Sequence, residues 1–212
     1  IWQWHMGQAL VRTPNNFGIN GEKPSHPKLL DWLAIEFMDR GWSMKSMHWL
    51  IMTSNTYQMS SLHNNPKAHL LDPANTLLWR MNRRRLEGEE LWDSMVSIAG
   101  VLNLELYGRS IVPPLSKEDL DGKYKLKQWG NVTSDPEQYR RGIYFLSQRN
   151  FIFPMFEAFD NPQNATSCPQ RDVTTVAPQA LWFLNNRTAF KQAGSFAARL
   201  VKRNGENMSN WV

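Results

Sequence analysis

The sequence predicts a mainly α-helical fold, an irregular helical domain with at most a small β element. Two observations favour this fold class. Several segments carry apolar residues at three- and four-residue spacing, which is the period of an amphipathic helix. Most of these segments also begin or end at residues that cap helices, such as Ser43 and Gly100. One short segment is rich in β-forming residues, so any sheet must be small.

Two helices are expected within the first forty residues. The first should cover residues 1–10, and a loop rich in Asn, Pro and Gly follows it. The second should cover residues 27–40, with Ser25 or His26 as its N-cap and Gly41 as its C-cap. Its predicted apolar face consists of Leu29, Leu30, Leu33 and Phe37.

A third helix is expected to start behind a cap at Ser43 and to end at the polar run 53–56. Its predicted face consists of Met44, Met47, His48 and Ile51. Because few residues separate it from the second helix, the two should pack as a helical hairpin. A loop over residues 64–73 leads to a fourth helix over residues 84–99, which Gly100 should end. Its predicted stripe consists of Leu91, Met95, Ile98 and Leu102.

The second half of the chain is expected to be less regular. Residues 107–137 have turn character, and residues 142–147 are the best strand candidate. One or two helical turns should follow Pro154. Two further helices are expected, with Thr175 and Thr188 as their N-caps. The predicted face of the last helix, which should end at Gly205, consists of Phe190, Ala193, Ala197 and Val201.

Length and composition limit the class of protein. The 212 residues are enough for one large domain, and we expect a single partial domain over residues 1–212. The chain opens at Ile1 without an initiator Met or a signal peptide, so we expect a fragment truncated at both ends. No apolar run approaches the ~20 residues that cross a bilayer, so no membrane span is expected. The single cysteine excludes an internal disulfide framework, a multi-cysteine zinc site and a Cys-x-x-Cys-His haem attachment.

Arginines are the main candidates for binding an outside molecule. Four of them fall within residues 80–85, and a guanidinium binds phosphate or carboxylate through paired hydrogen bonds. Internal ion pairing is the favoured alternative, because Arg83–Glu87 and Arg85–Glu89 have helical i,i+4 spacing. The net charge of +5 permits weak attraction to nucleic acid or acidic polysaccharide without requiring it. The candidate anion ligands are Arg12, Arg80, Arg83, Arg84, Arg149 and Arg171.

The histidines and the cysteine form no recognisable catalytic or metal motif. The five histidines include no His-x-x-x-His pair, so no metal site is expected. His48 is expected to pack in the core and His26 to act as a cap. Cys168 would be reactive beside a positive group such as Arg171, but a small buried residue is the favoured interpretation. Aromatic side chains that stack on sugars or bases when exposed, and otherwise fill a core, are Trp129, Tyr139, Phe151 and Phe153.

Ordered motifs run along nearly the whole chain. They include Arg12-Thr13-Pro14-Asn15, Phe17-Gly18, His26-Pro27, Leu30-Asp31-Trp32-Leu33-Ala34, Gly41-Trp42-Ser43, Thr56-Tyr57, Asp72-Pro73, Leu78-Trp79-Arg80-Met81-Asn82-Arg83-Arg84-Arg85-Leu86-Glu87, Arg141-Gly142-Ile143-Tyr144 and Pro178-Gln179-Ala180-Leu181. By these motifs the chain resembles the planctomycete-type domain of unknown function 1553. Two positions depart from the family pattern. Trp4 stands where the first His of a His-His pair is common, and Gly88 stands where Ala is common.

The resemblance implies the C-terminal part of a large, exported bacterial protein, with a cytochrome-c-like domain and a second uncharacterised domain upstream. It therefore implies an extracytoplasmic location and a haem c in a neighbouring domain, with no cofactor in this segment. It carries over no catalytic residue, so whether the chain is an enzyme stays open. The favoured function is a non-catalytic structural or interaction module whose partners are other domains of the same polypeptide. The alternatives are part of an enzyme or binding module for acidic or sulfated polysaccharide and, less favoured because acids interrupt the basic residues, nucleic-acid binding.

Overall fold

The computed structural model describes residues 1–115, 131–149 and 151–204, and in these ranges the chain is mainly α-helical, as predicted. The described residues contain isolated β-bridges and no strand. None of the described helices is long and apolar enough to span a membrane. Two compact units are present, Ile1–Arg85 and Leu86–Val212. This division does not test the predicted single domain, which stays a prediction.

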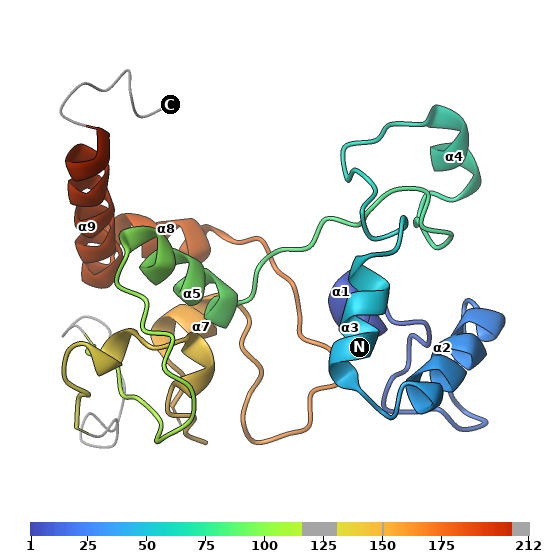
Figure 1. Ribbon diagram of the computed structural model, residues 1–212, viewed down its shortest axis with the longest axis horizontal. Coiled ribbons are helices and arrows are strands. Elements are labelled where there is room, and N and C mark those ends of the chain that lie inside the picture. The colour runs from blue at the N-terminus through green and yellow to red at the C-terminus, as the bar shows by residue number, and fades with distance from the viewer. Residues whose placement is uncertain (116–130, 150, 205–212) are drawn as a thin grey trace. The chain divides into compact units, whose positions relative to one another are not determined.

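Unit 1 contains four helices within its described residues: α1 (Trp2–Met6), α2 (Pro27–Asp39), α3 (Met44–Met52) and α4 (Pro66–Leu71) (Figure 1). Helix α1 is shorter than predicted because Gly7 takes a left-handed conformation, with φ of 81°, and ends it. Helix α2 begins at Pro27 as expected, and the Ser43 hydroxyl caps α3 by accepting a hydrogen bond from the Ser46 backbone N–H at 3.3 Å.

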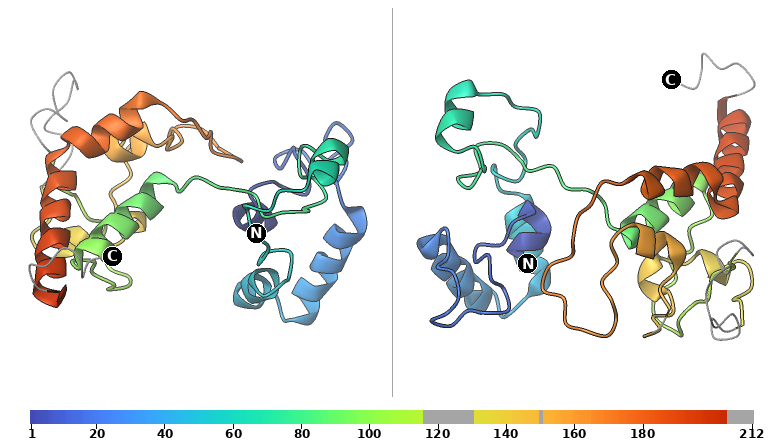
Figure 2. Two further views of the ribbon diagram at one scale, coloured as in Figure 1. Left: turned by 90° about the horizontal axis from the view of Figure 1, so that it is seen from above. Right: turned by 180° about the vertical axis from the view of Figure 1, so that it is seen from behind.

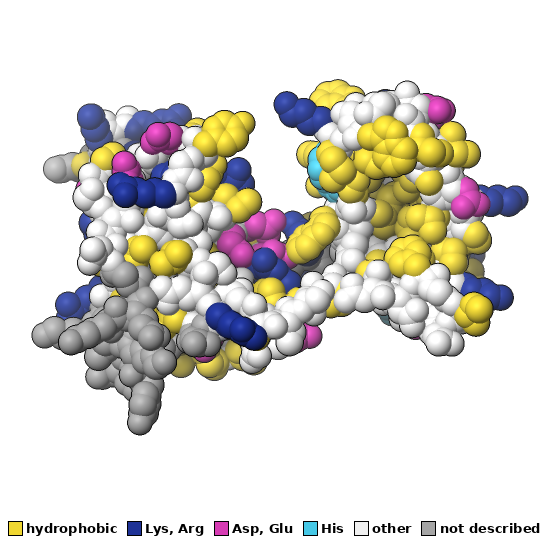
Figure 3. Space-filling model, turned by 90° about the horizontal axis from the view of Figure 1, so that it is seen from below, with side chains coloured by type: hydrophobic (Ala, Val, Ile, Leu, Met, Phe, Trp, Pro, Cys, Tyr) yellow, Lys and Arg dark blue, Asp and Glu magenta, His cyan; other side chains and the backbone are white. Residues whose placement is uncertain are grey.

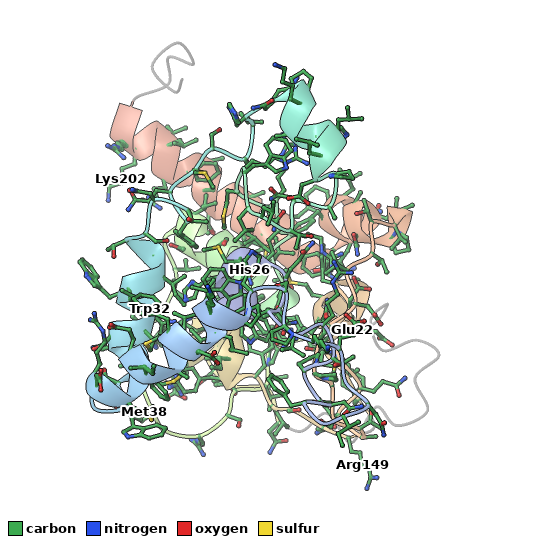
Figure 4. All side chains as sticks on the ribbon, turned by 90° about the vertical axis from the view of Figure 1, so that its right-hand side faces the viewer. Glu22, His26, Trp32, Met38, Arg149 and Lys202 are labelled. Atoms are coloured by element: carbon green, nitrogen blue, oxygen red, sulfur yellow. The ribbon has the colours of Figure 1, made fainter. Side chains whose placement is uncertain are left out.

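The core of unit 1 lies where α2 packs against α3, which confirms the predicted hairpin. Leu10, Leu33 and Met47 are buried there. Partly buried side chains around them are Trp2, Leu29, Leu30, Phe37 and Leu50, so the predicted face of α2 is confirmed. Trp32 and Met38, on the other side of α2, are exposed (Figure 4).

Asparagines connect the polar segment before residue 86 to α1. The Asn75 side chain is 2 % exposed and donates to the Arg80 carbonyl at 2.8 Å and to Asn82 Oδ1 at 2.9 Å. Asn82 Nδ2 in turn donates to the Met6 carbonyl at the end of α1, at 3.0 Å. The two side-chain amides thus donate hydrogen bonds to backbone carbonyls, those of Arg80 and Met6, that have no partner within a helix or sheet.

Unit 2 is built around α5 (Gly88–Ala99), which packs against α7 (Pro154–Ala158), α9 (Arg187–Asn204) and the short 3-10 turn η3 (Gly142–Tyr144). A second 3-10 turn, η2 (Glu137–Tyr139), precedes η3. Helix α8 (Ala177–Asn185) packs against α7 and α9. Figure 2 shows residues 160–176 as a long segment without helix between α7 and α8.

An aromatic cluster forms the core of unit 2. Trp92 of α5 is 1 % exposed and meets the Phe145 ring at a centroid distance of 4.9 Å. Phe153 and Phe156 complete the cluster, with Phe156 stacked on Phe145 at 4.9 Å. The burial of Phe153 and Tyr139 confirms core packing for these two aromatics, whereas Trp129 lies outside the described residues.

Helix α5 differs from the prediction in its start and in its buried face. It begins at Gly88, because Glu87 and Glu90 form a capping box in which the Glu90 carboxylate accepts from the Glu87 backbone N–H at 3.0 Å. Residues 84–87 are therefore not helical. The buried positions are Gly88, Trp92, Val96 and Ala99, and predicted Ile98 is 51 % exposed. The prediction followed the aliphatic residues and missed the tryptophan.

The strand predicted over residues 142–147 is wrong. Gly142–Tyr144 form the turn η3. Within the described residues, the segment pairs only through the isolated bridge between Phe145 and Ile111. Gly142 packs against α5 so closely that a Cβ there would lie 2.9 Å from Glu89 Cα. This tertiary contact overrides the β-propensity of the segment.

Three further predictions in unit 1 and unit 2 are corrected. The loop predicted over residues 64–73 contains α4, whose N-cap is the Asn65 side chain, accepting from the Lys67 and Ala68 backbone N–H groups. Helix α8 begins behind Val176 and not behind Thr175. Helix α9 begins at Arg187, and Asn186 accepts from the Thr188 N–H, so Thr188 is not the cap.

The predicted apolar face of α9 is exposed. Phe190 is 62 % and Val201 37 % exposed, whereas Ala189 and Gln192 are buried. The predicted end of this helix at Gly205 lies outside the described residues. Packing against α5 and α8 determines which side of α9 is buried. The sequence of α9 alone does not encode these contacts.

Candidate functional site

A cleft in unit 2 brings together charged and aromatic side chains from segments that are far apart in the sequence. Its volume is about 430 Å³. The first turn of α5 forms one wall, and residues 141–147, residues 151–153 and the loop before α8 form the others. We call it the acidic cleft, after the carboxylates of Glu87, Glu89, Glu90 and Asp93 that line it.

The acidic wall follows from the position of these residues at the start of α5. The unpaired backbone N–H groups and the dipole of a helix favour negative side chains in its first turn. Glu89 and Glu90 occupy that turn, and Glu87 is the residue before the helix. Gly88 allows this turn to approach α7, because a Cβ at Gly88 would lie 2.9 Å from Phe156 Cδ1. An Ala at this position would not fit without movement.

Arg171 forms ion pairs with two of these carboxylates. Its Nη1 and Nη2 atoms donate to the two Glu89 carboxylate oxygens at 2.7 and 3.0 Å, and Nη1 lies 3.1 Å from Glu87 Oε2. The hydrogen bond with Glu89 raises the pKa of Arg171 above its ordinary value. The two-pronged geometry is the strong form of an arginine–carboxylate pair. It fastens the loop before α8 to the start of α5, 82 residues away.

Arg141 and Asp93 form a second internal pair at the same cleft. Arg141 Nε donates to Asp93 Oδ2 at 2.9 Å, and the Gly142 backbone N–H donates to Asp93 Oδ1 at 2.6 Å. Asp93 thus holds the turn η3 against α5 through both of its oxygens. On the face drawn in Figure 3, both acidic and basic side chains are present.

A buried arginine that sequence reasoning missed lies beside the cleft. Arg140 is 5 % exposed, and its guanidinium donates to the backbone carbonyls of Glu105, Tyr107 and Arg109. It also lies over the Tyr144 ring, with Cζ 3.8 Å from the centroid. All three carbonyls belong to the irregular segment after α5, so Arg140 gives that segment the partners a sheet would provide. No local sequence signal distinguishes Arg140 from the other arginines.

Two guanidiniums, those of Arg141 and Arg171, lie among the four carboxylates of the acidic cleft, so acidic groups are in excess. An outside anion would have to displace the Glu89 carboxylate from Arg171. This exchange breaks a charge-assisted hydrogen bond before a new one forms. Arg171 therefore holds the elements of the cleft together more readily than it holds an outside anion.

Unit 1 contains a second cluster of functional groups, in which two histidines face each other. His5 Nε2 of α1 lies 2.7 Å from His48 Nδ1 of α3, and the Tyr57 ring meets the His5 ring edge-on at 5.7 Å. Burial, His48 and Arg84 lower the pKa of His5, with burial as the largest cause. We call this contact the histidine pair. His48 was expected in the core, but it is only half-buried.

The six predicted anion ligands are divided between the two units. Arg12, Arg80, Arg83 and Arg84 belong to unit 1, and Arg149 and Arg171 belong to unit 2. Of these, Arg171 lines the acidic cleft, and Arg149 is exposed and points outward (Figure 4). Arg80 lies over the Trp79 ring, with Cζ 4.8 Å from the centroid. Whether the six bind an outside anion stays a prediction.

The helical ion pairs predicted for the arginine run are not formed on a helix, because Arg83 and Arg85 precede α5. Glu87 and Glu89 pair with Arg171. This pairing spans 82 residues between Glu89 and Arg171 and has no local signal in the sequence.

Three other residues considered from the sequence have structural partners. Asp160 accepts from the Thr174 backbone N–H at 2.8 Å and from its hydroxyl at 2.9 Å. The His26 ring lies 3.0 Å from the Ser25 hydroxyl. Cys168 is exposed, so its predicted burial is wrong, and its thiol lies 3.0 Å from the Gln170 carbonyl. Over the described ranges, no three His, Cys, Asp or Glu residues group so as to hold a metal ion.

One protein-family model, described as PSD1, protein of unknown function (DUF1553), matches residues 1–211. The match therefore extends over both compact units. Comparison with the curated proteins and with the solved structures gives no match. A role for the chain has to be argued from its own geometry.

Proposed function

Because the chain belongs to the DUF1553 family, whose description gives no activity, we propose from its geometry that it is a non-catalytic structural and interaction module. One observation carries the proposal. The guanidinium of Arg171, the predicted anion ligand that lines the acidic cleft, already holds two carboxylates of the same unit. A group that is neutralised inside the fold contributes to holding that fold together.

Other arginines of unit 2 support the same role. Arg140 bonds to three backbone carbonyls, and Arg141 bonds to Asp93. Arg199 of α9 donates to the Ser97 and Ile98 carbonyls at the end of α5, at 3.3 and 2.7 Å. A cationic side chain at the C-terminal end of a helix satisfies carbonyls that have no helical partner. These arginines therefore brace helices and loops.

The interaction half of the proposal rests on apolar side chains that unit 1 leaves exposed. They lie on α2 and α3, and they are Trp32, Ile35, Met38, Trp49 and Met52. The Trp49 side chain is the most exposed of the five, at 71 %. Exposed tryptophan and methionine are enriched where proteins contact one another. We propose other domains of the same polypeptide as the partners, in an extracytoplasmic protein whose haem c belongs to a neighbouring domain; the location and the haem rest on the family resemblance alone.

Binding to a sulfated polysaccharide tests the structural role against the runner-up, a module for acidic polysaccharide. The probe is heparin, titrated calorimetrically into residues 1–212 at about 0.15 M salt, where the Debye length of ~8 Å screens weak surface attraction. We expect no saturable heat. Saturable binding that Arg171→Lys weakens while the exposed control Arg203→Lys does not would contradict the proposal, because it would give Arg171 an outside ligand.

Nucleic acid is the less favoured alternative, and the same titration with a DNA duplex tests it. Binding through phosphates needs a basic area and weakens steeply with salt. The face drawn in Figure 3 carries Lys and Arg interspersed with Asp, Glu and apolar side chains. We therefore expect no duplex binding at this salt concentration.

The interaction role is tested on the longer polypeptide that the proposal requires. Oxidative surface labelling of Trp49 and Met52 is compared between residues 1–212 alone and the complete polypeptide. We expect both side chains to be protected in the complete polypeptide, with Phe190 of α9 as the exposed reference residue. Equal labelling of Trp49 in the two proteins would contradict a docking role for this face of unit 1.

A further inference from the structure

The histidine pair spans the contact between α1 and α3 in unit 1. The facing atoms, His5 Nε2 and His48 Nδ1, are 2.7 Å apart, which is a hydrogen-bond distance. The ring planes are inclined by 67°. Helix α1 packs against α3, and the two histidines are 43 residues apart in the chain. The bond is thus a tertiary contact between two helices.

The contact tolerates only one hydrogen between the two nitrogens. In the neutral pair, one ring donates its N–H and the other accepts with a lone pair. A first added proton can go to the far nitrogen of the donor ring and leaves the bond intact. A second added proton has to occupy the accepting nitrogen, and it sets two N–H groups against each other at this distance. Doubly protonated rings must therefore move apart.

The surroundings oppose protonation of His5. Among the described residues, the charges that act on His5 are those of His48, Arg84 and the amino group of Ile1, all of which are cationic when charged. The other charged residue of α3, Lys45, is exposed and also basic. Helix α1 contains no further titratable residue, and Tyr57 presents its ring to His5. Among the residues that the structure describes, no carboxylate acts on the His5 ring to compensate an imidazolium charge.

Helix α1 depends on such contacts for its stability. It has five residues, and isolated helices shorter than about 12 residues are marginal in water. Its anchors are the buried Met6 side chain, the bond from Asn82 to the Met6 carbonyl, partly buried Trp2 and the histidine pair. Repulsion between the two protonated rings would therefore push α1 away from α3.

We propose that the histidine pair is an acid-sensitive latch, which holds α1 on α3 while one hydrogen is shared and releases α1 when both rings are protonated. The proposed ligand of the latch is a proton. In the part of the chain that the structure describes, the two histidines belong to no group of three side chains that could hold a metal ion. The latch does not depend on the proposed module function, since it concerns only contacts within unit 1. Release uncovers Met6 and part of the Leu10–Leu33–Met47 core.

Hydrogen exchange of α1 as a function of pH tests the latch. Protection factors of amides 4–7 are measured in residues 1–212 from pH 7.5 to pH 4.5, with intrinsic exchange rates divided out. Gly7, whose N–H donates to the Gln3 carbonyl at 2.9 Å, is the reporter. We expect protection in the wild type to fall below pH 6.5, by up to about tenfold per pH unit for each proton linked to release.

Two substitutions keep a hydrogen-bonding atom near the contact and remove one of the two imidazoles, so that a doubly protonated pair cannot form. His5→Gln places an amide near the position of Nε2, and His48→Asn places one near the position of Nδ1. Both are expected to make the protection of α1 independent of pH over this range. His69→Gln, which changes an exposed histidine outside the pair, is expected to behave as the wild type.

Ring nitrogen NMR of the wild type provides a second measurement that needs no substitution. We expect the His5 ring to take up its proton below its ordinary pKa and in step with loss of α1 protection. Protection of α1 that does not change between pH 7.5 and pH 4.5, or that falls equally in His5→Gln, would overturn the latch. Protonation of the His5 ring without loss of protection would overturn it as well.

Discussion

Gly88, the first residue of α5, lies against Phe156 of α7 so closely that a Cβ at Gly88 would stand 2.9 Å from Phe156 Cδ1 and 3.1 Å from Phe156 Cα. Gly88 is buried, and Phe156 belongs to the aromatic core of unit 2. This contact sets how near the first turn of α5, with its acidic side chains, comes to the rest of the cleft.

Gly88→Ala is therefore expected to destabilise unit 2. Overpacking a core costs ~1–3 kcal/mol, and the better helix propensity of Ala returns about 1 kcal/mol, so the free energy of unfolding should fall by up to roughly 2 kcal/mol. The matched control is Gly194→Ala on α9, where a Cβ meets nothing within 4 Å, and which should raise stability by up to about 1 kcal/mol. Urea unfolding measures both; equal effects of the same sign would refute the packing argument.

Arg140→Lys is expected to lower the stability of unit 2 by ~2–3 kcal/mol, because a lysine ammonium cannot reproduce the fork that reaches three carbonyls. Arg149→Lys, an exposed change of the same kind, should stay within about 0.5 kcal/mol of the wild type. Chemical denaturation of the two variants side by side gives the difference. A cost near zero for Arg140→Lys would mean that the carbonyls of residues 105–109 find water or another donor.

Leu33→Ala tests the core of unit 1. Leu33 is 9 % exposed between α2 and α3, so its truncation should cost ~2–5 kcal/mol as a cavity mutation. Ile35→Ala on the opposite side of α2, where Ile35 is 52 % exposed, should cost no more than about 0.5 kcal/mol. Thermal unfolding followed by circular dichroism resolves the two variants. A similar melting shift for both would show that α2 is oriented differently.

Lys191 and Tyr139 link stability to alkaline pH. Lys191 Nζ lies 2.6 Å from the Tyr139 hydroxyl, and this hydrogen bond raises the pKa of Lys191 above 10.5. A raised pKa in the folded state contributes stability that is fully present below pH 10.5 and is lost as the pH rises through the folded value. Tyr139→Phe removes the bond, so the variant should lose less stability than the wild type above pH 10.5. Parallel slopes of unfolding free energy against pH would refute this linkage.

Local signals were sufficient for some elements and could not define others. Helices α2 and α3 start at Pro27 and behind the Ser43 cap, so their positions follow from residues within one turn. The buried face of α9 could not be predicted in this way. Phe190 is exposed and Gln192 is 2 % exposed, because the contacts with α5 and α8 determine which side is covered.

The candidate sites were less predictable than the helices. Arg171 was singled out from the sequence, but its partners Glu87 and Glu89 lie more than eighty positions earlier, as the 82-residue separation from Glu89 illustrates. His5 and His48 belong to helices that meet only in the folded unit. Spacing rules detect ligands on one element, and neither site is built on one element.

A double-mutant cycle on Arg171 and Glu89 tests most directly the claim that the arginines brace the fold. The free energy of unfolding is measured for the wild type, Arg171→Met, Glu89→Gln and the double variant, with Arg149→Met as a control for loss of an exposed charge. An internal brace predicts a coupling energy of about 1–3 kcal/mol between the two residues. A coupling energy of zero, with Arg171→Met no more destabilising than Arg149→Met, would contradict the account.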